Sequence, residues 1–153
     1  MNTLESLKVK GRLNIVLRDK DGNVKDERDV DNLVVSSGLA YIISRMVGTS
    51  KSVMSHMGLG SGTTAAAAAQ TDLVSLLGSR EVLDSTTIAG TDNEKVVYVA
   101  SFESGDATGA VTEAGIFNAS TSGDMLCRTV FPVVNKGADD ALTVTWTITL
   151  SAV

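Results

Sequence analysis

The stretch that decides the fold runs from Val111 to Leu150 and reads VTEAGIFNASTSGDMLCRTVFPVVNKGADDALTVTWTITL. In its last segment apolar residues alternate with threonines, so that Thr143, Thr145, Thr147 and Thr149 separate Leu142, Val144, Trp146, Ile148 and Leu150. A period of two is typical of a β-strand with one apolar and one polar face. This segment is therefore expected to cover a hydrophobic core.

Two further strands are expected upstream in the same stretch. Residues 125–134 (MLCRTVFPVV) are apolar on both faces and end in NKGADD, and the VTEAGIFN before them ends in ASTSGD, whose residues favour turns. Three successive strands with short connections predict a β-meander. Pro132 lies inside the middle strand and cannot donate to the ladder, which predicts a sheet edge or a bulge there. An open edge would invite pairing with another chain.

Towards the N-terminus the pattern predicts a hairpin and then a helix. Residues 8–18 and 23–29 alternate as strands around Asp21-Gly22, a strong hairpin signal, and a short extended piece follows at 33–35. Apolar residues then recur at spacings of three and four, which predicts an amphipathic helix over about 37–47, capped by Ser36 or Ser37 and ended by Gly48. These apolar residues are Leu39, Ile42, Ile43, Met46 and Val47.

The middle of the chain predicts loops and two more strands. The glycines of MGLGSGTT (57–64) lack the ending of a phosphate-binding loop, and they indicate positive φ or a close backbone approach. The alanine run 65–69 is expected to be loop, and Thr71 to cap a short helical turn that Gly78 closes. Strands are expected at 80–89 and from residue 95.

Together these elements predict a mainly β protein with one helix, an antiparallel β-sandwich or jelly-roll-like barrel. The chain has 153 residues, which suits one domain, here residues 7–153, preceded by an N-terminal arm at 1–6 that is flexible or docks on a neighbour. The net charge of −5 argues against a nucleic-acid partner, and Lys8, Lys10 and Arg12 indicate a solvated face. No apolar stretch is long enough to cross a membrane, and no signal peptide is present, which indicates folding in a cytoplasm.

No residue pattern indicates catalysis, a cofactor or a metal. His56 is the only histidine, and neither Ser55 nor Ser61 lies in a nucleophile motif beside it. The single cysteine, Cys127, excludes an intrachain disulfide and is expected to be buried. Glu113 lies among small and apolar residues, so it is either solvated or buried with a partner such as Arg128 in the next strand.

Three segments resemble a group of small bacteriophage virion proteins. They are MGLGSGTTAAAAAQTDL at 57–73, VTEAGIFN at 111–118 and MLCRTVFPVVNKGADDALTVTWTITL at 125–150. The shared pattern is a glycine-Ser-Gly-Thr-Thr loop, a strand with Glu-Ala-Gly-Ile/Leu-Phe, a strand with Leu-x-Arg-Thr and a Thr-rich terminal strand. The resemblance implies a virion structural protein, above all a head decoration or cement protein that binds the assembled shell. It carries no catalytic residue.

The partners implied are the major capsid protein, or neck and tail proteins of the same virion, together with further copies of the chain as a dimer or trimer. Contacts are expected at the N-terminal arm and the 57–70 loop, with Met57, Gly58, Gly60, Gly62 and Pro132 as interface residues. An alternative is a neck, collar, tail or baseplate adaptor that anchors a fibre. From a different class, a carbohydrate-binding β-sandwich would need exposed aromatic rings, whereas Trp146 falls on the apolar face of its strand.

Overall fold

The computed structural model describes residues 6–48 and 51–152. Within this part the chain forms nine strands and one helix: β1 (Leu7–Arg18), β2 (Val24–Val34), α1 (Ser36–Met46), β3 (His56–Gly60), β4 (Glu81–Val82), β5 (Ser85–Ala89), β6 (Lys95–Phe102), β7 (Gly109–Phe117), β8 (Met125–Lys136) and β9 (Ala141–Ala152). The fold is mainly β, as the alternating patterns predict. Of the predicted N-terminal arm, residues 1–5 lie outside the described residues.

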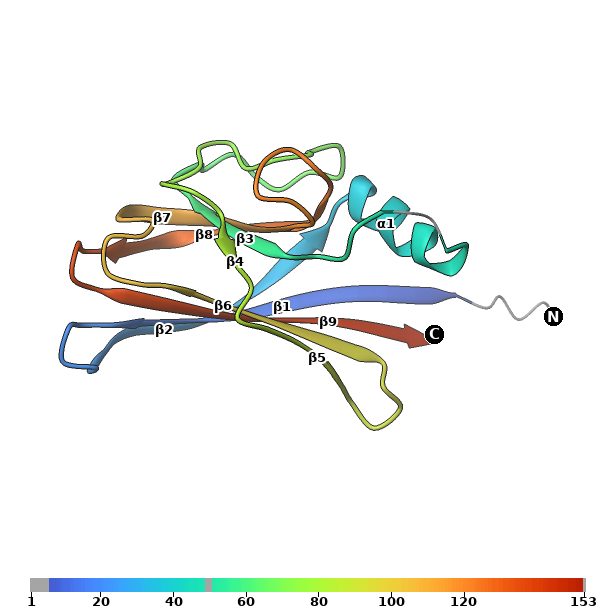
Figure 1. The fold of residues 1–153 in the computed structure, drawn as a ribbon, viewed down its shortest axis with the longest axis horizontal. Coiled ribbons are helices and arrows are strands. Elements are labelled where there is room, and N and C mark those ends of the chain that lie inside the picture. Colours follow the sequence, from blue (N-terminus) through green and yellow to red (C-terminus); the bar gives the residue numbers. More distant parts are fainter. Residues whose placement is uncertain (1–5, 49–50, 153) are drawn as a thin grey trace.

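The strands form one curled antiparallel sheet, a half-barrel in the order β4-β3-β7-β8-β2-β1-β9-β6-β5. Figure 1 shows that the curl produces two layers, with β3, β7 and β8 above β1, β9, β6 and β5. Strand β2 joins the layers, because it pairs with β1 over most of its length and with β8 only at Leu33 and Val34. A second connection between the layers is the chain itself, which passes from β4 in the upper layer to β5 in the lower layer.

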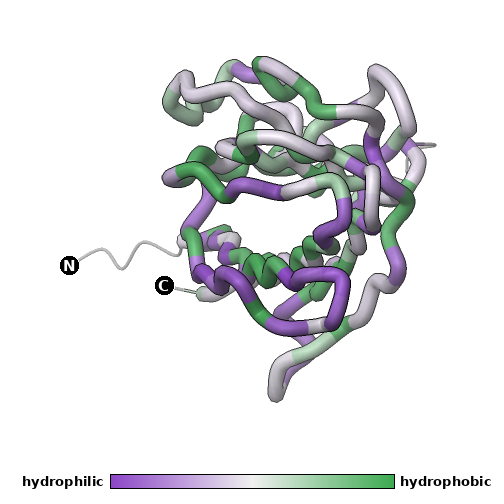
Figure 2. Tube along the Cα trace, turned by 90° about the vertical axis from the view of Figure 1, so that its left-hand side faces the viewer, coloured by the Kyte–Doolittle hydropathy of each residue, from purple (hydrophilic) through white to green (hydrophobic). Residues whose placement is uncertain are grey.

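The hydrophobic core lies between the two layers. On β1 the alternation places Leu13, Ile15 and Leu17 on the inward face, and all three are at most 2% exposed. On β9 the alternation places Trp146 in the core with no exposed surface, and Cys127 of β8 is buried as expected. Figure 2 shows hydrophobic and hydrophilic residues alternating along the strands of the lower layer.

The predicted β-meander is wrong in its third strand. Strands β7 and β8 pair, but β9 lies between β1 and β6 in the other layer, with Trp146 opposite Leu13 and Tyr98. The turn after β8 therefore changes layer instead of closing a hairpin. Its Asp140 carboxylate accepts hydrogen bonds from the Gly137 N–H and from Lys25, both at 2.8 Å, which fixes the crossing. Alternation identifies the inward face of a strand and does not identify the neighbouring strand.

Helix α1 covers one end of the half-barrel, close to the predicted range. It ends near Gly48, whose φ is +66°. The predicted serine cap is wrong, because the N-cap residue is Val35 without a side-chain hydrogen bond. Ser37 instead donates to the Met125 carbonyl of β8 at 2.6 Å. A Cβ on Gly38 would lie 2.0 Å from the Leu126 carbonyl oxygen, so only glycine allows this close packing.

Two other local predictions need correction. Residues 71–77 form no helical turn but an extended loop that pairs with the end of β3 through one bridge, Gly60 to Leu76. The predicted strand at 80–89 is two short strands, β4 and β5, because the chain passes from one layer to the other between them. The alanine run is loop, as predicted.

Pro132 lies at a β-bulge, one of the two environments predicted for it. The register of β7 and β8 shifts between Val111 and Glu113, and residues 131–133 of β8 have no register partner. On the other side of β8, β2 pairs only with Cys127 and Arg128, so among the described residues no strand pairs there with residues 131–133. Arg28 of β2 crosses the gap and donates to the carbonyls of Pro132 and, at 2.8 Å, of Val133.

Candidate functional site

Glu113 and Arg128 form a buried ion pair between β7 and β8. Both side chains have 0% exposure, and the Arg128 Nη2 and Nε atoms lie 2.7 and 3.0 Å from Glu113 Oε2. The structure therefore decides between the two environments left open by the sequence. A buried pair needs further hydrogen bonds to compensate for lost solvation.

Those hydrogen bonds come from the loop that follows β3. The N–H groups of Gly62 and Ser75 donate to Glu113 Oε1 at 3.0 and 2.7 Å, and that of Val74 donates to Oε2 at 3.0 Å. Burial raises the pKa of Glu113, but the hydrogen bonds from Ser75, Val74, Arg128 and Gly62 outweigh it and hold the pKa below its usual value. The carboxylate thus anchors both ends of the 61–76 loop.

Arg128 fixes the middle of the same loop. Its Nη1 donates to the Thr64 carbonyl and to the Gln70 side-chain oxygen, both at 2.9 Å. Gln70 in turn accepts from the Ala67 N–H at 2.9 Å and donates to the Ala65 carbonyl at 3.2 Å. The hydrogen bonds of Arg128 and Gln70 thus hold this alanine-rich segment, which has no regular structure, in one conformation. Residues of the segments 57–73, 111–118 and 125–150 meet at this anchor.

The position of Glu113 requires glycine at the end of β3 and at the start of the loop. A Cβ on Gly60 or Gly62 would lie 2.4 or 2.5 Å from Glu113 Oε1, so a close approach explains these residues and positive φ does not. Met57, Gly58, Gly60 and Gly62 are all buried within the chain. The prediction that these four residues form an interface is corrected accordingly, because they have no surface to offer a partner. Pro132, the fifth, is exposed, and its role in an interface stays a prediction.

An apolar surface does exist, on the outer face of α1. Leu39, Ile43, Met46 and Val47 are 47%, 60%, 78% and 73% exposed. Their spacing of four, three and one places them on one side of the helix. The opposite side, with Gly38, Tyr41 and Ser44, is the buried one. We name these four outward residues the α1 stripe.

The sequence pattern predicts the apolar residues of the α1 stripe but does not predict that they face away from the core. Four of the five residues that make the helix amphipathic face outward, whereas an amphipathic helix ordinarily turns its apolar face to the core. The small residue Gly38 was the available signal, because close helix packing requires a small residue on the buried side. Beside α1 lies an apolar cavity of about 260 Å³, whose lining includes Tyr41, Val96 and Ile148.

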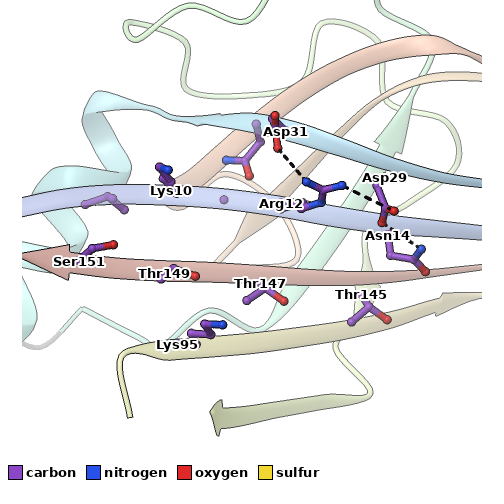
Figure 3. A pocket seen from close by; sticks show the side chains of 13 residues that line it. Lys10, Arg12, Asn14, Asp29, Asp31, Lys95, Thr145, Thr147, Thr149 and Ser151 are labelled. Carbon is purple, nitrogen blue, oxygen red and sulfur yellow. Dashed lines mark hydrogen bonds and ion pairs between the residues drawn. The ribbon is translucent and has the colours of Figure 1, made fainter. Parts of the chain in front are cut away.

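A second, polar groove of about 820 Å³ lies on the outer face of the lower layer. Figure 3 shows its three rows: acids on β2, basic residues and an asparagine on β1, and hydroxyls on β9. Arg12 lies 3.7 Å from Asp29 and 4.0 Å from Asp31, all three well exposed. Solvent-exposed pairs of this kind contribute little free energy. Lys10 and Lys95 flank Thr149 in register across the sheet.

Within the described residues, the contacts reveal no arrangement of side chains for catalysis or metal binding. Ser55 Oγ lies 2.8 Å from His56 Nδ1, but no carboxylate is hydrogen-bonded to His56 in the described ranges, and His56 lines neither cavity. No group of three His, Cys, Asp or Glu side chains within 6–48 and 51–152 is placed to hold a metal ion. All six aromatic side chains are buried, at 7% exposure or less, so none forms a platform for a sugar.

Comparison with known proteins gives no relative: no family model, no curated protein and no solved structure matches this chain. Among the described residues, no helix has both the length and the apolar character needed to span a bilayer.

Proposed function

We propose that this protein is a bacteriophage virion structural protein that decorates the assembled head shell. The observation that carries the proposal is the α1 stripe, an apolar helix face that the chain leaves exposed. Contiguous apolar surface of this kind marks protein contact sites. A shell subunit that presents an apolar groove is the proposed occupant of the stripe.

The buried anchor supports the same proposal. Glu113 and Arg128 use their hydrogen-bonding capacity to fix a loop, and not to line an open cleft. The sequence segments that resemble phage virion proteins are those that this anchor joins. A neck, collar, tail or baseplate adaptor uses the same kind of surface and differs only in its location. No observation favours the carbohydrate-binding alternative, since the aromatic side chains are buried.

The first test is to locate the protein by immunogold labelling of purified virions in negative-stain electron microscopy. Label over the whole head is the expected result. Label confined to the neck or tail would replace decoration by the adaptor role. Absence of label, together with absence of its peptides from virion mass spectrometry, would contradict a virion role.

The second test addresses the α1 stripe. The double substitution Ile43→Asp and Met46→Asp is expected to leave the fold intact, because both side chains are more than half exposed, and to abolish incorporation into particles. Val24→Asp is the matched control, since Val24 is 52% exposed in the hairpin at the opposite end of the molecule (Figure 1). Normal incorporation of the folded double variant would remove the stripe from the proposal.

A further inference from the structure

The two edges of the curled sheet differ in how they are protected. At one edge β4 is only two residues long, and the next residue, Leu83, donates to the Ser55 carbonyl at 2.9 Å. A very short edge strand is a common device against unwanted pairing. At the other edge β5 pairs with β6 over five residues and has no strand on its outer side in the part of the chain that the structure describes.

Strand β5 has none of the usual protections. Its sequence, Ser85-Thr86-Thr87-Ile88-Ala89, contains no charge and no proline, and its register with β6 shows no bulge. Three of the five residues are β-branched, which favours strand pairing. Four are exposed, and Ile88 is 70% exposed although it is the only large apolar residue among them. Figure 1 shows β5 at the outer margin of the lower layer.

We infer that β5 is a homodimer interface, in which the β5 strands of two copies pair antiparallel about a two-fold axis and join their sheets. This goes beyond the proposed function and does not depend on it. An interface of this kind is isologous, because the same surface serves both copies. Main-chain hydrogen bonds to an exposed edge supply affinity, and the side-chain pairs supply the register.

The sequence of β5 is self-complementary in this arrangement. With the axis at Thr87, the threonines of the two copies lie opposite each other, and Thr86 lies opposite Ile88 of the second copy, twice. Cross-strand pairs of β-branched residues stabilise a sheet, and no like charges meet. A second copy of this chain is therefore the occupant that the strand fits.

The side of the sheet on which Ile88 lies adds to the contact. Ile88 is opposite Val96 of β6 and lines the apolar cavity beside α1. A two-fold axis normal to the joined sheet places the cavities of both copies on the same side, next to the junction. The exposed Ile88 side chain then loses solvent contact, which favours association.

The test is sedimentation equilibrium of the full chain from low micromolar to several hundred micromolar concentration, with two double variants. Thr86→Lys with Ile88→Lys places lysine opposite lysine twice, whereas Thr86→Lys with Ile88→Glu places lysine opposite glutamate twice. Because the two variants change the same exposed positions, both should fold, and their circular dichroism melts should show the same thermal stability. The wild type is expected to show a reversible monomer–dimer equilibrium over this concentration range.

The dilysine variant should weaken dimerisation roughly tenfold or more, because like charges face each other and the Ile88 burial is lost. The lysine–glutamate variant should dimerise at least ten times more tightly than the dilysine variant at low salt, and this difference should shrink at high salt. A wild type that stays monomeric, or forms trimers, would overturn the inference. So would a dilysine variant that dimerises as tightly as the wild type, or a lysine–glutamate variant that dissociates as readily as the dilysine variant.

Discussion

At the scale of single residues, Glu113 carries more of the structure than its place in an apolar strand suggests. Five hydrogen bonds converge on its carboxylate, three from loop N–H groups and two from Arg128. Glu113→Ala should lower the free energy of unfolding by about 3–5 kcal/mol, because it leaves the Arg128 charge buried without its partner. Urea denaturation followed by circular dichroism measures this change.

The control for this substitution is Glu27→Ala. Glu27 is exposed on β2 and accepts one hydrogen bond, from Asn14 at 3.3 Å. Its loss should change stability by less than about 0.5 kcal/mol, as is usual for surface positions. If Glu113→Ala were equally mild, the pair would not be a structural anchor and the account of the loop would fail.

Trp146 is the residue that fixes the position of β9 in the core. It has no exposed surface, and its Nε1 donates to Asn32 Oδ1 at 2.8 Å. The Asn32 side chain fits here because its cross-strand partner is Gly11, which has no Cβ. A Cβ at that position would collide with Asn32. Trp146→Ala should destabilise the fold by about 3–5 kcal/mol in thermal and urea melts. A change within error would mean an exposed tryptophan and would reopen the sugar-binding alternative.

At the scale of elements, the 61–76 loop behaves as part of the sheet although most of it has no regular structure. Gly62→Ala should displace Glu113, since its Cβ would lie 2.5 Å from Oε1 and 2.6 Å from the Val74 Cβ. We expect a loss of about 1–3 kcal/mol, typical of overpacking, and faster hydrogen exchange at the Val74 and Ser75 amides. Gly22→Ala is the contrast, because no atom lies within 4 Å of its Cβ and only the strain of φ +85° is added.

The elements also show which parts of the fold can be predicted from the sequence. Alternation and turn residues located the hairpin at Gly22, the helix and the inward face of β9, because these depend on local periodicity. The layer that β9 joins depends on its pairing with β1, a strand more than a hundred residues away in the sequence, which no local pattern records. The loop conformation likewise depends on Glu113 and Arg128, and the sequence left the environment of Glu113 open.

The same distinction applies to the candidate site. The amphipathic pattern of residues 39–47 was visible, but the side of α1 that faces the core is set by contact with the Leu126 carbonyl. The sequence predicts Gly58, Gly60 and Gly62 at an interface, whereas in the structure all three are buried, and a Cβ on Gly60 or Gly62 would collide with the Glu113 carboxylate. The unprotected edge of β5 becomes visible only when the strand order is known.

At the scale of the whole molecule, acid should destabilise the fold through carboxylates whose pKa values are lowered on folding. The pKa of Asp140 is lowered by its hydrogen bonds from Lys25 and Gly137, and the pKa of Glu113 is lowered by its loop contacts despite burial. A lowered pKa in the folded state stabilises the fold above the unfolded pKa, and this contribution is lost as pH falls through the folded value.

The free energy of unfolding should therefore be nearly constant around neutral pH and fall steadily below about pH 5, where unfolded carboxylates begin to bind protons. Urea melts at a series of pH values measure this dependence. Glu113→Gln should be less stable at neutral pH and lose stability less steeply in acid, because the variant lacks one of the titrating groups. Parallel slopes for the variant and the wild type would show that the Glu113 pKa is not lowered in the fold, since the protons taken up on acid unfolding would then come from other carboxylates.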